Sequence, residues 1–332
     1  MRLSQTPIEA ARSFAKAIKA QDSETAIILA GEFLRVVRLI TAEIAAYVAA
    51  AQTYTKREQR ERLEVIRAQM VSSLEAFGQF AGSLITVQQR AAIASAVEDA
   101  HTLFLLSQAR STSQLVASAS WTRAPIEALE MLVGKLANGS TMGDYLAAKA
   151  GEAWPKARTE IIRSLATGRN PRRTARAIRA AMNGNLVSAL ITSREAQVGT
   201  YNEATLEQYR ANPELIKGYR RLSALGPRTC ALCWALHGKF YRLAEEFVRH
   251  LNCRCTLVPE VEGLDSNIGD GEDLFRESTE NLKRKVLRVR EYELYQAGKI
   301  ELSDLIGYRD SAKWGRTLRR KTLSEIDPDS KA

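Results

Sequence analysis

Residues 24–80 contain no proline, and this uninterrupted stretch limits what the chain can fold into more than any other feature. Apolar residues recur in its first half at the three- and four-residue steps that place them on one face of a helix. A charged segment, KREQRERLE at residues 56–64, follows and separates two apolar halves. The pattern predicts one very long helix, or two helices joined near residues 53–56. The recurring apolar positions are Ile27, Ile28, Phe33, Leu34, Val37, Ile40, Ile44 and Val48.

Further helix signals surround this stretch. Thr6 is a capping residue followed by Pro7, and together they predict that a helix begins at about Pro7. Asp22 offers a second start, and residues 86–108 are expected to form another helix. These signals predict that residues 1–150 form a helical hairpin or bundle whose apolar stripes serve as core or as subunit contacts.

The four cysteines of the chain all lie between residues 230 and 255. Cys230 and Cys233 have the C-x2-C spacing that lets two thiolates on one turn bind the same tetrahedral ion. His250 and Cys253 repeat that spacing, and Cys255 lies beside them. The pattern predicts one structural zinc ion per chain, for which five candidate ligands compete for four positions. The candidates are Cys230, Cys233, His250, Cys253 and Cys255.

Other uses of these cysteines stay open at this point. They could be buried spare thiols, a disulfide pair, or a catalytic cysteine served by His250 or His237. Zinc would be structural with four protein ligands, and catalytic only if one position stayed open to water. The β-prone segments 237–243 and 253–259 predict a small hairpin, resembling a zinc knuckle, that braces the ion.

The cysteine-rich segments also carry a resemblance. RTCALCWALHGKFY (228–241) and HLNCRCTLVP (250–259), with residues 164–182 and 191–209 upstream, resemble the phage Mu F-type minor head protein family, also called the phage head morphogenesis domain. The resemblance covers about residues 150–260. It implies a non-enzymatic, capsid-associated structural protein of the virion, assembled in the host cytoplasm and bound near the portal of a tailed phage. Its implied partners are the portal protein and the major capsid protein, and its implied roles are head morphogenesis and DNA packaging or ejection.

Charge indicates an anionic partner. The chain has 48 Lys and Arg against 38 Asp and Glu, a net charge of +10. Between residues 156 and 179 basic residues dominate and Glu160 is the only acid. Arginines at three- and four-residue steps there predict a helical stripe that contacts the phosphates of double-stranded DNA without reading its sequence. A solvated helix face or an acidic protein partner is the alternative. The arginines are Arg169, Arg172, Arg173, Arg176 and Arg179.

The predicted fold class is mainly α with a small α+β module. We expect a helical domain at residues 1–150, a head-morphogenesis module with the Cys/His cluster at 151–262, and an acidic linker with a basic helical tail at 263–332. No apolar run reaches the length of a membrane-spanning helix, so no membrane partner is expected. Two rival functions stay open: a cytoplasmic zinc-bearing protein that binds nucleic acid, and an enzyme or toxin carried in the phage head.

Overall fold

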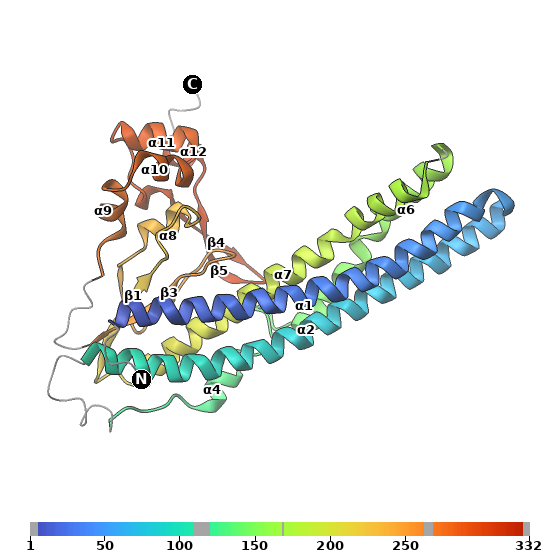
Figure 1. Ribbon diagram of the computed structural model, residues 1–332. Coiled ribbons are helices and arrows are strands. Elements are labelled where there is room, and N and C mark those ends of the chain that lie inside the picture. Colours follow the sequence, from blue (N-terminus) through green and yellow to red (C-terminus); the bar gives the residue numbers. More distant parts are fainter. Residues whose placement is uncertain (1–5, 109–119, 168, 262–267, 328–332) are drawn as a thin grey trace. The chain divides into compact units, whose positions relative to one another are not determined.

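The computed structural model describes residues 6–108, 120–167, 169–261 and 268–327 (Figure 1). The chain divides into two compact units, each built from separated segments. Helices α1, α2 and α7 each contribute residues to both units. The first unit comprises Met1–Ala20, Gln89–Val133 and Gln197–Ala332, and the second comprises Gln21–Gln88 and Gly134–Ala196.

Two long helices form the N-terminal part of the chain (Figure 1). Helix α1 (Pro7–Ala50) and helix α2 (Lys56–Gln108) meet at the short 3-10 helix η1 (Ala51–Thr53), so the second of the two expected arrangements is present. Thr6 caps α1 as predicted, because its side chain accepts from the Glu9 amide at 3.2 Å and its amide donates to Glu9 at 2.8 Å. No helix begins at Asp22 or at residue 86, since both positions lie inside continuous helices.

Among its described residues, the second unit is helical apart from one isolated β-bridge between Lys135 and Thr141. Besides parts of the long helices it contains α5 (Met142–Ala148), η2 (Lys149–Glu152), α6 (Trp154–Thr167) and the N-terminal part of α7 (Pro171–Arg210). Gly82 explains how closely α5 approaches α2, because a Cβ atom there would lie 2.4 Å from the backbone of Gly143. The buried side chains include Phe33, Ile40, Ile44, Met70, Leu74, Ile161 and Ile178.

The first unit contains a three-stranded antiparallel sheet in the order β2-β1-β3. The expected strands are present as β2 (Phe240–Arg242) and β3 (Thr256–Val261), but they do not pair with each other. Strand β1 (Ile216–Leu222) lies between them and pairs with both. The unit also contains α4 (Ile126–Glu130) and the one-turn helix α8 (Ala231–Ala235).

The C-terminal part of the first unit is helical, with one hairpin that the sequence patterns did not predict. The helices are α9 (Gly271–Arg276), α10 (Glu280–Val286), α11 (Val289–Gln296), η3 (Ser303–Leu305) and α12 (Leu323–Ile326). Strands β4 (Ile306–Ser311) and β5 (Gly315–Arg320) form the hairpin. The Leu318 amide donates to the Arg249 carbonyl at 3.0 Å, which ties β5 to the loop that carries His250.

The predicted fold class is confirmed: the described residues are mainly helical, with long N-terminal helices and small antiparallel sheets. Part of the expected acidic linker, residues 262–267, lies outside the described residues. The domain boundaries predicted at residues 150 and 262 stay predictions. Within the described ranges, every helix is too short or too polar to cross a lipid bilayer.

Candidate metal centre

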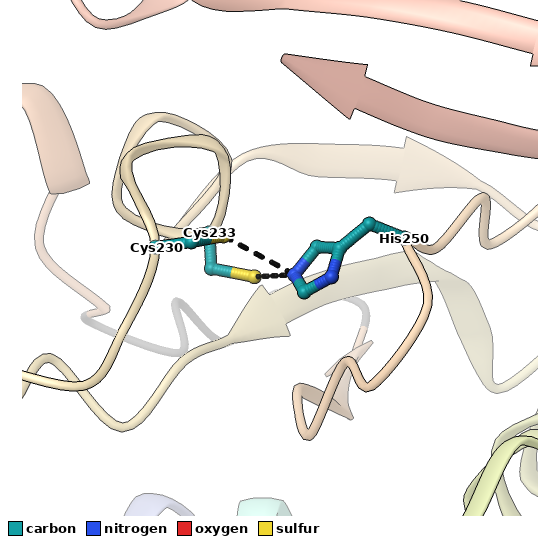
Figure 2. A group of neighbouring side chains, drawn as sticks. All are labelled: Cys230, Cys233 and His250. Atoms are coloured by element: carbon teal, nitrogen blue, oxygen red, sulfur yellow. Dashed lines mark hydrogen bonds between the residues drawn. The ribbon is translucent and has the colours of Figure 1, made fainter. Parts of the chain in front are cut away.

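Three neighbouring segments of the first unit carry the Cys/His cluster, of which Figure 2 shows Cys230, Cys233 and His250. Cys230 is the N-cap residue of α8, and Cys233 lies one turn into that helix. His250 and Cys253 belong to one tight turn, closed by the Cys253 amide donating to the His250 carbonyl at 3.1 Å. Asn252 gives this turn its left-handed step, with φ of 65°. Cys255 precedes β3 directly.

All five predicted ligands come together. The Nε2 atom of His250 lies 3.2 Å from the Cys230 sulfur and 3.0 Å from the Cys233 sulfur (Figure 2). The sulfurs of Cys233 and Cys253 are 3.8 Å apart. The donor atoms form two overlapping groups, Cys230–Cys233–His250 and Cys233–Cys253–Cys255, each with every pair within 4.8 Å. Cys233 is common to both groups and is therefore the centre of the cluster.

The distance between the Cys233 and Cys253 sulfurs fits a tetrahedral ion of the zinc type. A zinc ion bound at about 2.3 Å by thiolates separates neighbouring sulfurs by about 3.8 Å, which is the Cys233–Cys253 distance. The disulfide alternative does not occur in this structure, because all four cysteines are free. A disulfide would require sulfurs about 2.05 Å apart.

His250 has the orientation of a metal ligand. Its Nδ1 atom lies 2.7 Å from the Leu251 carbonyl oxygen, which can only accept a hydrogen bond. Nδ1 therefore carries a proton, and Nε2 points toward the cysteine sulfurs, where a metal ion would replace its proton. Histidine ligands in metal sites commonly donate their second ring nitrogen to a backbone carbonyl in this way.

The hydrogen bonds of Ser223 indicate that Cys255 has a different role from the other three cysteines. The Ser223 hydroxyl donates its single proton to the Cys233 carbonyl at 2.7 Å. Its contact with the Cys255 sulfur at 3.2 Å must then use the thiol of Cys255 as the donor. The hydrogen bond with Cys233 lowers the pKa of Cys255, but Cys253 and burial raise it to about 12. Cys255 is thus held as a thiol, which favours Cys253 as the fourth ligand.

Cys230, Cys253 and His250 favour charged forms, whereas hydrogen bonds with Cys230, Cys253 and Cys255 raise the pKa of Cys233 well above its ordinary value. The hydrogen bond with Cys233 lowers the pKa of Cys230 to about 4, although burial opposes this shift. The pKa of Cys253 is also lowered, first by its hydrogen bond with Cys233. Burial lowers the pKa of His250, but its hydrogen bonds with Cys230 and Cys253 raise it to about 11. A metal ion replaces the protons shared within this group, as zinc binding requires.

The structure places the His237 ring against Ser223. The His237 side chain is buried, and its Nδ1 atom accepts a hydrogen bond from the Ser223 amide at 2.9 Å. Burial and the charge of Arg12 lower its pKa to about 4, against a smaller opposite effect of Asp270. His237 therefore supports the cluster through Ser223.

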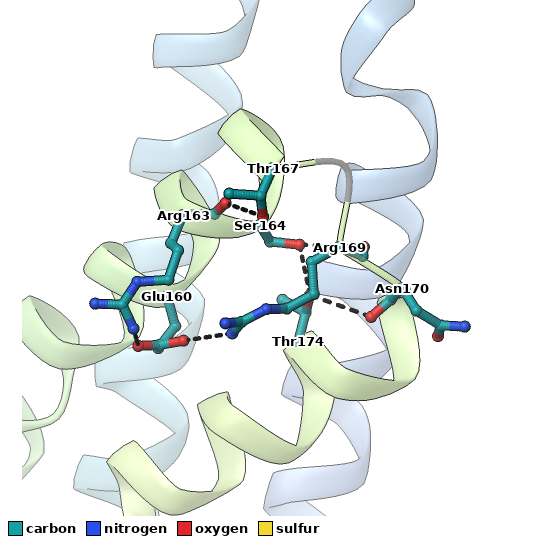
Figure 3. A network of polar contacts seen from close by, with 7 residues as sticks. All are labelled: Glu160, Arg163, Ser164, Thr167, Arg169, Asn170 and Thr174. Carbon is teal, nitrogen blue, oxygen red and sulfur yellow. Dashed lines mark hydrogen bonds and ion pairs between the residues drawn. The ribbon is translucent and has the colours of Figure 1, made fainter.

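The five arginines predicted to contact DNA do not form one continuous stripe. Arg169 lies in the turn between α6 and α7, and Glu160 holds its guanidinium at 2.9 Å (Figure 3). Glu160 also pairs with Arg163, and Ser164 meets Thr174 across the same turn at 2.5 Å (Figure 3). The other four are exposed on the first turns of α7, and no ion pair holds them within the described residues. They are Arg172, Arg173, Arg176 and Arg179.

Sequence patterns missed Arg221, which the structure buries in the interior of the first unit with 1% of its surface exposed. A basic residue in a short strand gives no sequence signal of burial. Its Nη2 atom donates to the Val248 carbonyl, and its guanidinium carbon lies 4.2 Å from the centre of the Phe247 ring. The Nε and Nη1 atoms have no hydrogen-bond partner among the described residues.

Comparison with known proteins gives one match. Residues 156–258 match the family described as Phage Mu protein F like protein. The matched segment includes all five cluster residues and the exposed arginines of α7. No curated protein and no solved structure matches the chain.

Proposed function

We propose that the chain is a minor head protein of a tailed phage, because residues 156–258 match the family described as Phage Mu protein F like protein. It acts in head morphogenesis and in packaging or ejection of DNA, at the portal vertex of the virion, with the portal protein and the major capsid protein as partners. The family match over the cluster-bearing segment is the observation that carries this proposal. It also favours a structural role over an enzymatic one.

The proposed metal centre holds one zinc ion, bound by Cys230, Cys233, His250 and Cys253. Four protein ligands close the coordination shell, so the ion has a structural role and leaves no position for a reacting water. The ion would connect α8 to the turn at residues 250–253. No disulfide joins these two segments, because all four cysteines are free. Zinc binding then contributes directly to the folding free energy of the first unit.

The exposed arginines of α7 are the proposed DNA-contacting surface. At 100° per residue, Arg172, Arg176 and Arg179 project within one narrow sector of the helix, and Arg173 lies beside it. Their exposure and lack of ion pairs leave their charges available to phosphates. Arg169 is the weakest member of the predicted set, because Glu160 already neutralises it.

Association with heads tests the proposed function. The chain is traced by mass spectrometry through purification of intact heads of the phage that encodes it, and its copies are counted relative to the portal protein. The proposal predicts that it stays with heads in few copies after a high-salt wash. Complete recovery in the soluble fraction would contradict it, and would favour the cytoplasmic zinc-bearing nucleic-acid-binding protein.

A further inference from the structure

The strongest unexplained feature of the first unit is the buried charge of Arg221. Arginine keeps its proton at all physiological pH values, so burial does not neutralise it. A buried charge without a counter-charge is strongly destabilising. Among the described residues, however, Arg221 forms no ion pair with a carboxylate. Glu245 and Glu246 line a cavity of about 300 Å³ with Arg221, but both are exposed.

Strand register places Arg221 on the same side of the sheet as the cysteine cluster. Arg221 is paired with Leu257, and Leu222 with Thr256. One more step of this register brings Ser223 opposite Cys255, in agreement with their 3.2 Å contact. Residues two apart on a strand point to the same face, so Arg221 and Ser223 share the face that the cluster occupies. The adjacent Arg220 points the other way and pairs with Glu260 at 2.9 Å.

We propose that Arg221 supplies the counter-charge of the metal centre, which binds zinc as an anionic complex of three thiolates and one imidazole. Such a complex carries a net charge of about −1, and one guanidinium neutralises it inside the protein. Burial lowers the pKa of Arg221, yet its electrostatic interactions with Cys255, Cys253, Tyr241 and Cys233 raise it. This inference rests on the proposed metal centre and assigns a residue outside the ligand set to it.

The proposal explains two features together. The Nε and Nη1 atoms of Arg221 have no hydrogen-bond partner among the described residues, and metal binding would place the negative charge of the thiolates on their side of the sheet. The guanidinium is also fixed in place, by Phe247 on one face and by the Val248 carbonyl at one nitrogen. Arg221 therefore does not bind the metal itself. Its fixed positive charge stabilises the metal-bound thiolates.

Zinc affinity of the full-length protein, measured by competition with a chromogenic chelator, tests this inference. Replacing Arg221 by Gln is expected to weaken zinc binding about 10–100-fold, as loss of groups around a metal site does. The charge-retaining Arg221→Lys is expected to stay within about threefold of the wild type. The matched control Arg220→Gln removes the same charge from the opposite face and is expected to leave affinity unchanged.

Cobalt substitution adds a readout that loss of packing alone would not change. The thiolate-to-cobalt absorption of Arg221→Gln should require a higher cobalt concentration but reach the same final intensity. Wild-type zinc affinity in a folded Arg221→Gln protein would overturn the inference, as would equal weakening by Lys and Gln. If Gln prevents folding, Arg221→Lys is tested alone, and a weakening of its zinc binding by more than about tenfold, although the charge is kept, would contradict the inference. A wild-type protein that binds no zinc would instead overturn the proposed metal centre itself.

Discussion

The Cys/His cluster and the arginine face of α7 both lie in the family-matched segment, but they use charge in opposite ways. In the cluster, three cysteines are buried, Cys230 and His250 are half-buried, and each of the five contacts another group of the same chain. On α7, Arg172, Arg176 and Arg179 are exposed and have no ion pairs within the described residues. The contrast indicates that the first region serves the fold of this chain, whereas the second is available to another molecule.

Loss of the central ligand is expected to have the largest effect. Replacing Cys233 by Ser removes a member of both donor groups and should abolish zinc binding. Because the binding energy of a structural zinc is also folding energy, we expect the first unit to lose several kcal/mol of stability. Zinc content and thermal unfolding of the full chain measure this.

Two further cysteine variants sharpen that result. Cys253→Ser should behave like Cys233→Ser, because Cys253 is the proposed fourth ligand. Cys255→Ser should keep its zinc, because the new hydroxyl can still donate to Ser223. If Cys255→Ser lost zinc and Cys253→Ser retained it, Cys255 would be the fourth ligand in place of Cys253.

The arginine face should respond to salt and not to metal. Changing Arg172, Arg176 and Arg179 together to Gln should reduce the slope of log affinity for duplex DNA against log salt by about 3 units, equally for unrelated sequences. The effect should be the same with and without zinc. Fluorescence anisotropy over a range of salt concentrations measures the slope.

A matched triple variant controls for net charge. Arg35, Arg57 and Arg67 lie in the same unit but pair with Glu32, Glu61 and Glu64 along their own helices. Changing all three to Gln removes the same charge, yet should leave the slope nearly unaltered. Equal losses from the two triple variants would mean that total charge, and not the face on α7, governs DNA binding.

A glycine pair tests whether the second unit is stable without metal. Gly82→Ala would place a Cβ atom 2.4 Å from the Gly143 backbone, and we expect a loss of about 1–3 kcal/mol. Gly31→Ala on α1 meets nothing within 4 Å and should gain up to about 1 kcal/mol from helix propensity. Both changes should be independent of zinc in chemical denaturation. A zinc-dependent Gly82→Ala effect would show that the metal also stabilises the second unit.

The smallest expected effect concerns Asp99, a first-unit residue outside the cluster. Burial raises its pKa to about 6, although the hydrogen bond from Tyr201 opposes the shift. A raised pKa of an acid favours its protonated form, so its stabilisation is complete below the unfolded value of about 4 and is lost as pH rises through about 6. Stability curves from pH 4 to 7 should therefore converge with those of Asp99→Asn at low pH and separate above it. We expect about 1 kcal/mol, because solvent screens this half-buried site.

Local signals in the sequence were sufficient for some features of the fold and the cluster. The capping pair Thr6 and Glu9 fixed the start of α1, and the charged segment after residue 53 marked the junction with α2. The C-x2-C spacing identified Cys230 and Cys233 because both lie on one turn of α8, where spacing along the chain decides distance in space.

Features that depend on pairing between segments far apart in the sequence could not be predicted from local patterns. Strand β1 lies between β2 and β3, and its central position follows from hydrogen bonds across separations that no local pattern encodes. The burial of Arg221 follows from that same placement. The three-residue step along the chain predicts that Arg169 lies with the α7 arginines, but Arg169 precedes the helix and pairs with Glu160 instead.

Metal content of the purified full chain tests the central claim most directly. Elemental analysis, after expression without added zinc and purification under reducing conditions, should give about one zinc ion per chain for the wild type and for Cys255→Ser, and none for Cys233→Ser. Free thiols titrated in the same samples should react only after a chelator removes the ion. Wild-type protein that is folded, contains no zinc and has four freely reactive or disulfide-bonded cysteines would contradict the account.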